Sequence, residues 1–147
     1  MSKQALIVRS HEGNILNVLG VPLRFLCGAE QTGNAWSLME NVLPKHAGPT
    51  PHHHPWDEAY YVVEGEVDFM IEGRPQRIRA GDFVYAPANT VHAFSGASDE
   101  PARMLVFDAP AHAEAFFEEL HDAGAQVPRD LQKVAEVGDR HGITFVR

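Results

Sequence analysis

The sequence has little that would let the chain bind nucleic acid or cross a membrane. Its 147 residues contain 12 lysines and arginines against 20 aspartates and glutamates, which gives a formal net charge of −8 at pH 7. No run of basic residues interrupts this balance, and affinity for phosphate groups requires clustered positive charge. No apolar run approaches the ~18 residues that a membrane-spanning helix needs. We therefore expect neither nucleic acid nor a membrane as a partner.

Cysteine is nearly absent, which excludes an internal disulfide and a cluster of thiolate metal ligands. The single Cys27 lies in the stretch "LRFLCGAE", where a small apolar filler is the simplest interpretation, so we assign it no role. The first twenty residues lack the long apolar core and the small-residue cleavage site of a secretory signal. A chain of this kind is expected in the cytoplasm.

A chain of 147 residues is expected to form one domain, spanning 1–147. From residue 5 to about 108, short apolar or alternating segments are separated by glycine, proline and asparagine. In "EVDFMIEG", Val67, Phe69 and Ile71 alternate with other side chains, as a strand with one buried face requires. This texture predicts an all-β fold, either a barrel or a sandwich, with a core barrel at about 30–108.

After Pro110 the apolar residues no longer alternate but recur at the spacing of a helix. A first helix is expected to have its apolar face formed by Ala113, Phe116, Phe117 and Leu120. A second short helix, which begins at Pro128, is expected to have Leu131, Val134 and Ala135 on one face. Gly124 follows the first helix where a C-terminal cap belongs. We expect a short helical tail at about 110–141 that packs on the barrel.

The stretch "GPTPHHHPWDEAYYVVEGEV" contains three consecutive histidines between prolines. In a strand, His52 and His54 point to one face and His53 to the other. Pro55 biases His54 towards an extended conformation. Glu58 has the same parity, provided that no bulge intervenes, and so brings a carboxylate beside two imidazoles. The alternative interpretation is a polar surface turn that is rich in histidine by chance.

A second stretch, "AGDFVYAPANTVHAFSG", supplies another histidine on a different strand. Antiparallel strands joined by the short connection around "EGRPQ" can return the chain so that His92 faces the first histidine pair across a barrel. Alone, His92 would be an ordinary barrel histidine. Together with His52, His54 and Glu58 it completes a candidate set of four metal ligands.

These two stretches resemble the two motifs of the cupin superfamily. The first motif is matched by His52, His54, Glu58 and Gly65, and the second is approached by Gly81, Pro87, Asn89 and His92. The glycine expected six residues before His52 falls at His46, and Gly96 replaces the terminal asparagine of the second motif. Asn89 stands where the family has glycine, and we expect it to keep the turn because asparagine tolerates positive φ.

The resemblance implies a double-stranded β-helix, or jelly-roll barrel, that pairs as a homodimer. It supports one divalent transition-metal ion held by His52, His54, Glu58 and His92, and this ligand set suits iron, manganese, nickel, cobalt, copper or zinc without choosing among them. Glu58 is also the candidate catalytic base, since a carboxylate can accept a substrate proton. Parity places Tyr60 and Phe94 on the faces of Glu58 and His92, as walls of a substrate pocket or as core filling.

The resemblance leaves three functions open. The first is a dioxygenase similar to the quercetin-dioxygenase-like cupins, which acts on a small enolic or phenolic compound. The second keeps the metal but not the oxygen, as an isomerase, lyase or decarboxylase in which the ion stabilises an enolate. The third is a metal-binding or small-molecule-binding module without catalysis.

Overall fold

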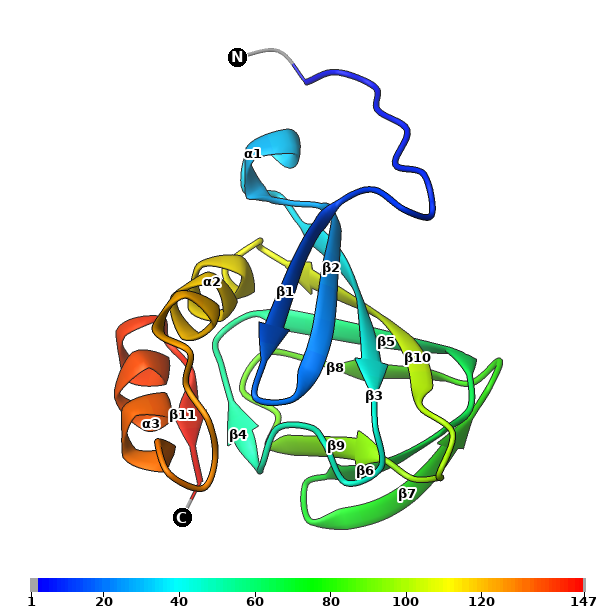
Figure 1. The fold of residues 1–147 in the computed structure, drawn as a ribbon, viewed down its shortest axis with the longest axis vertical. Helices are drawn as coiled ribbons and strands as arrows, with labels where there is room; N and C mark the ends of the chain where they lie inside the picture. The colour runs from blue at the N-terminus through cyan, green and yellow to red at the C-terminus, as the bar shows by residue number, and fades with distance from the viewer. Residues whose placement is uncertain (1–2, 147) are drawn as a thin grey trace.

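The computed structural model of the chain describes residues 3–146 as two antiparallel sheets with helices along one side (Figure 1). The six-stranded sheet contains, in spatial order, β1 (Asn14–Val18), β2 (Val21–Cys27), β3 (Ser37–Leu43), β10 (Ala102–Ala109), β5 (Asp57–Glu64) and β8 (Phe83–Ala86). The five-stranded sheet contains β11 (Thr144–Phe145), β4 (His52–His53), β9 (His92–Gly96), β6 (Glu66–Ile71) and β7 (Arg74–Arg79). This is the jelly-roll barrel that the sequence predicts.

The core lies between the two sheets and is built by alternation along the strands. In β5 the buried side chains are those of Glu58, Tyr60 and Val62, whereas Tyr61 and Val63 on the other face are exposed. Most inward positions are apolar, and burying one such side chain contributes about 1.5–3 kcal/mol. The predicted faces of β5 are therefore confirmed, and they place Glu58 inside the barrel.

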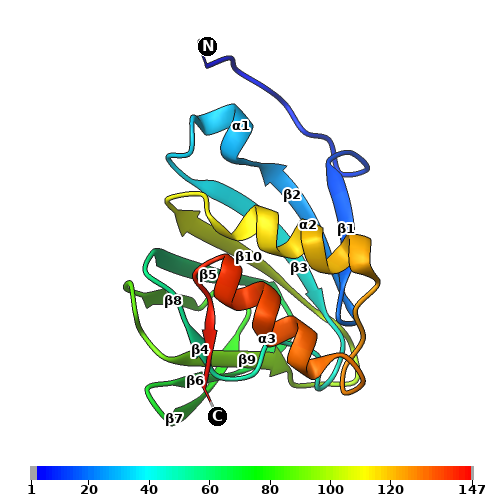
Figure 2. The ribbon, with the colours of Figure 1, turned by 90° about the vertical axis from the view of Figure 1, so that its left-hand side faces the viewer.

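The helical tail follows the prediction with one shift. Helix α2 (Ala113–Ala123) ends at Gly124, which is left-handed with φ 61°. Helix α3 (Leu131–Arg140) begins three residues later than the predicted start at Pro128, and it buries Val134 and Val137. Leu131, predicted on the packed face, is exposed because it lies in the first turn, outside the face that the two valines define. Figures 1 and 2 show α2 and α3 side by side along the sheets.

The sheet extends further towards the N-terminus than the predicted core barrel at about 30–108. β1 and β2, which lie in the alternating segments expected from residue 5 onwards, already join the six-stranded sheet. A one-turn helix α1 (Ala29–Thr32), which was not predicted, follows them. The apolar residues 5–8 form no strand. No helix within residues 3–146 has the length and apolar character needed to cross a membrane.

Candidate metal centre

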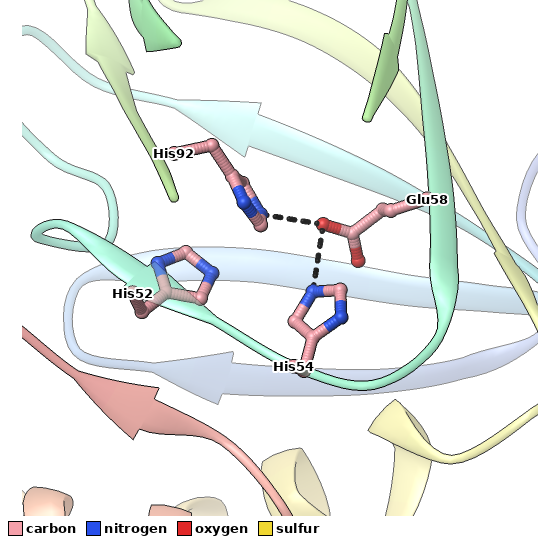
Figure 3. Close-up of side chains that lie close together, drawn as sticks. All are labelled: His52, His54, Glu58 and His92. Atoms are coloured by element: carbon pink, nitrogen blue, oxygen red, sulfur yellow. Dashed lines mark hydrogen bonds and ion pairs between the residues drawn. The ribbon is translucent and has the colours of Figure 1, made fainter. Parts of the chain in front are cut away.

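Four buried side chains meet inside the barrel, near the end where β4, β5 and β9 come together (Figure 3). They are His52, His54, Glu58 and His92, and one nitrogen or oxygen atom from each lies within 4.8 Å of the others. The structure thus brings together the four residues that the sequence singled out. Their role as metal ligands remains a prediction.

The cluster draws on both sheets, although not in the way the sequence suggested. His92 does not face the first histidines across the barrel, because β4 and β9 are neighbours in one sheet and place His52 directly opposite His92. The centroids of these two rings are 4.2 Å apart. Glu58 comes from β5 in the other sheet, so the carboxylate is the group that reaches across.

The chain between the histidines and Glu58 is not one continuous strand. β4 ends at His53, and β5 begins at Asp57 after a bend. His54 and Glu58 nevertheless share the buried face, whereas His53 is half-buried and lies outside the cluster. Asn89 has φ 70°, as predicted for its turn, and its N–H donates to the carbonyl of His54 over 2.7 Å. This hydrogen bond joins the turn of the second motif to the histidine segment of the first.

Each imidazole is fixed by a hydrogen bond to a backbone carbonyl. The pairs are His52 Nδ1 with Thr50 O at 2.8 Å, His54 Nδ1 with Trp56 O at 3.1 Å, and His92 Nδ1 with Thr90 O at 2.8 Å. A carbonyl oxygen only accepts, so each Nδ1 carries a proton and, in the neutral ring, Nε2 carries the free lone pair. All three rings are thus set in the tautomer that binds a metal through Nε2.

The chemistry of the donor set fits a divalent transition-metal ion. The buried Nε2 of His54 has no hydrogen-bond partner and lies 3.4 Å from Glu58 Oε1. Leaving such an atom unsatisfied costs about 1–3 kcal/mol, a cost that a bound ligand would remove. His92 Nε2 lies 3.1 Å from the same carboxylate oxygen. Three imidazole nitrogens and one carboxylate suit iron, manganese, cobalt, nickel, copper and zinc.

Electrostatics favour two of the protonation states that a metal site needs. Burial and the neighbouring His92 lower the pKa of His52 to about 4, so this imidazole is neutral at pH 7. Burial alone would raise the pKa of Glu58, but the neighbouring side chains of Asp108, His54 and His92 bring the pKa well below its usual range. Glu58 is therefore an anion at neutral pH.

Tyr60 links the cluster to the aromatic core. Its hydroxyl donates to Glu58 Oε1, and burial together with the charge of Glu58 raises its pKa, so the phenol stays protonated. Its ring packs edge-on against Phe69 and Phe94, with centroids 5.0 and 5.3 Å away. Tyr60 and Phe94 are both buried, and their assignment to a substrate pocket remains a prediction.

Sequence reasoning missed two residues behind the cluster. Asp108 is fully buried opposite Glu58 on β10, and Trp56 Nε1 donates to its Oδ1 over 3.0 Å. Burial and the charge of Glu58 raise the pKa of Asp108 well above its usual range. A signal was present in "RMLVFDAP", because Asp108 has the inward parity of Met104 and Val106. A charged residue at such a position calls for a buried partner.

Comparisons with known proteins agree with this fold. Residues 38–108 match the cupin domain family. The chain is 26% identical to quercetin 2,3-dioxygenase of Bacillus subtilis (strain 168) over 117 residues, covering 79% of this chain and 34% of that protein. It is 39% identical to the dimethylsulfoniopropionate lyase DddQ of Ruegeria pomeroyi over 56 residues, covering 37% of this chain and 27% of that protein. The chain thus spans about a third of the length of these relatives.

The fold has close counterparts among solved structures. An RmlC-like cupin from Shewanella frigidimarina superposes with a TM-score of 0.67 at 19% identity, over 78% of this chain and 99% of that one. This likeness shows the fold alone. The match over residues 38–108 identifies the core of this barrel as a cupin domain.

Proposed function

We propose that the chain is a metal-dependent enzyme in which His52, His54, Glu58 and His92 hold one divalent transition-metal ion. The observation that carries this proposal is the set of three imidazoles whose Nδ1 atoms are occupied by backbone carbonyls, beside one buried carboxylate. Four protein ligands leave up to two positions of an octahedron for small molecules, and open positions distinguish a catalytic ion from a structural one.

When bound, such an ion would supply a Lewis acid for a substrate oxygen and, if redox-active, a means of electron transfer to dioxygen. The chain itself would supply the proton chemistry. Glu58 is anionic and lies inside the barrel, so it can accept a proton from an acidic O–H or C–H group of the substrate. The hydrogen bond from Tyr60 fixes the carboxylate for that task.

The leading reaction is dioxygenation of a small enolic or phenolic compound. It is supported by the similarity to the quercetin 2,3-dioxygenase of Bacillus subtilis, which covers 79% of this chain. Tyr60 and Phe94 offer the apolar wall that such a substrate would need, with a single hydroxyl. Oxygen uptake by protein loaded with iron, manganese, nickel or copper, assayed with phenols, diketones and thiols, tests it. Uptake with phenols or diketones is expected, and none with any substrate would contradict it.

The second candidate reaction is a lyase, isomerase or decarboxylase reaction without oxygen. Its specific support is the higher identity, 39% over 56 residues, to a dimethylsulfoniopropionate lyase. Turnover that persists under strict anaerobiosis with a redox-inert ion such as zinc would favour it over the dioxygenase. If the ion binds tightly but exchanges no water, and no substrate is turned over, the chain is a binding module.

We further propose that the chain forms a homodimer through the outer face of the six-stranded sheet. Five aromatic side chains are exposed on this face or beside it, namely Trp36, Tyr61, Phe83, Tyr85 and Phe107. Tyr61 lies opposite Phe83, and Trp36 stacks on Phe107 with centroids 5.8 Å apart, so the residues form one aromatic face. Exposed apolar surfaces of this kind mark interfaces.

The charges beside the aromatic face favour a second copy as its occupant. Two chains of net charge −8 repel each other, so a self-docking surface must be locally neutral. Arg103 lies 2.8 Å from Glu40 and 3.6 Å from Glu64, so these charges are paired within one chain. Light scattering should give the mass of a dimer for the parent and for Val127→Glu, an exposed control, but of a monomer for Phe83→Glu. A monomeric parent would contradict the proposal and leave the face to another protein.

A further inference from the structure

The strand that carries His52 is very short and is held from both sides. β4 pairs with β9 through the single register pair of His52 with His92. On its other side β4 pairs with β11 through two register pairs, one of which places Phe145 opposite His52. The N–H of Val146 also donates to the carbonyl of Pro51 over 2.9 Å. Much of the backbone pairing that keeps His52 in the sheet therefore comes from the C-terminal strand.

The side chain of Phe145 also lies against the imidazole of His52. Their ring centroids are 5.7 Å apart and the planes are inclined by 37°. On its other side, Phe145 is close to α3, because a Cβ atom added to Gly138 would lie 3.0 Å from Phe145 Cε2. The ring of His52 thus lies between the ring of His92 and a phenyl ring that the tail holds in place, and it makes one hydrogen bond, to Thr50.

The two helices of the tail are held together independently of the cluster. Glu119 of α2 accepts hydrogen bonds from Arg140 and from His141 at the end of α3. Val137 of α3 is almost fully buried. Figure 2 shows β11 returning from α3 to lie beside β4. β11 is therefore presented to β4 by a packed helix.

We infer that Phe145 is a positioning residue for His52, which it holds with Nε2 aimed at the other three candidate ligands. This inference rests on the proposed metal site. Removing the phenyl ring would leave space beside His52 and allow its imidazole to turn. Groups that orient metal ligands without touching the metal typically contribute about 10–100-fold to metal affinity.

The experiment measures cobalt(II) affinity by competition with a chelator, together with the circular dichroism of the metal-free protein. Phe145→Ala should bind cobalt at least ~10-fold more weakly, and Phe145→Leu, which refills most of the volume without a flat face, about threefold more weakly. Leu131→Ala, an exposed apolar position in the same tail, is the matched control and should leave the affinity unchanged.

A double-mutant cycle with His52→Ala separates positioning from general stability. If Phe145 acts through His52, Phe145→Ala adds no further loss of cobalt affinity once His52 is gone, whereas additive losses would overturn the inference. Should Phe145→Ala fail to fold, the cycle is run with Phe145→Leu. A cobalt affinity of Phe145→Leu equal to that of the parent would then overturn the inference. A parent protein that binds no cobalt contradicts the proposed metal site instead.

Discussion

The indole of Trp56 lies flat on the imidazole of His54, with ring centroids 4.2 Å apart and planes inclined by 12°. The indole itself is tethered, because its Nε1 donates to the buried carboxyl of Asp108. Asp108 in turn lies opposite Glu58 across the β5–β10 ladder. Two of the four candidate ligands, His54 and Glu58, are therefore connected through a tryptophan and an aspartate that bind no ion themselves.

Trp56→Phe should destabilise the fold while keeping an aromatic ring on His54. The variant removes the hydrogen bond to Oδ1 of Asp108, whose Oδ2 already has no hydrogen-bond partner. Leaving this buried group unpaired should lower the free energy of unfolding by about 1–3 kcal/mol, measured by urea denaturation. Trp36→Phe, at a partly exposed tryptophan, is the control and should change it much less. Equal losses in both would show that the hydrogen bond is unimportant.

His52→Ala and His92→Ala should each weaken metal binding strongly, on the order of 100-fold or more, because each removes a candidate ligand. His53→Ala should not, since His53 lies outside the cluster and pairs with Thr144 of β11. Isothermal titration with zinc or cobalt measures all three. Equal losses from the three variants would refute the assignment of faces along this segment.

Metal affinity should weaken as the pH falls, chiefly because of His92. Burial alone would lower its pKa, but the hydrogen bond and charge of Glu58 raise the pKa above 6.5. This proton must leave before Nε2 binds an ion, so affinity should fall about tenfold per pH unit below that pKa. His52, with a pKa of about 4, adds no proton competition until the pH is far lower. An affinity that is constant between pH 8 and 5.5 would contradict this.

Protonation of His92, which weakens metal binding, should stabilise the fold of the metal-free protein. Because the pKa of His92 is raised on folding, its contribution to stability is complete below the unfolded value of ~6.5 and is lost as the pH rises through the folded value. Thermal unfolding of metal-free protein should therefore show this gain at acidic pH, and metal-loaded protein should not.

Tyr60→Phe should separate proton chemistry from metal binding. The variant keeps the ring that packs on Phe69 and Phe94 but removes the hydroxyl that donates to Glu58. We expect metal content to stay near that of the parent while the cobalt(II) absorption spectrum and any turnover change, because the carboxylate is freer to move. An unchanged spectrum and unchanged turnover would show that the hydrogen bond has no role in the site.

Local patterns in the sequence were sufficient to predict an all-β fold and the cluster, whereas the jelly-roll barrel was expected only from the resemblance to the cupin superfamily. Alternation places Glu58, Tyr60 and Val62 on one buried face, and the spacing of the two motifs brings His92 to the histidine pair. The pairing of β11 with β4 could not be predicted, since two residues carry no periodicity and their partner lies about 90 positions away. The order of strands in the sheets likewise decides whether His92 or Glu58 reaches across the barrel. The spacing of the two motifs along the sequence does not determine that order.

The metal content of the protein tests the central claim most directly. Elemental analysis of protein purified without an affinity tag or chelator should find about one divalent transition-metal ion per chain, and a His92→Ala variant prepared in the same way should have lost most of it. A parent protein that contains no such ion, and takes up none when zinc, cobalt, iron or manganese is added at pH 7.5, would contradict the account.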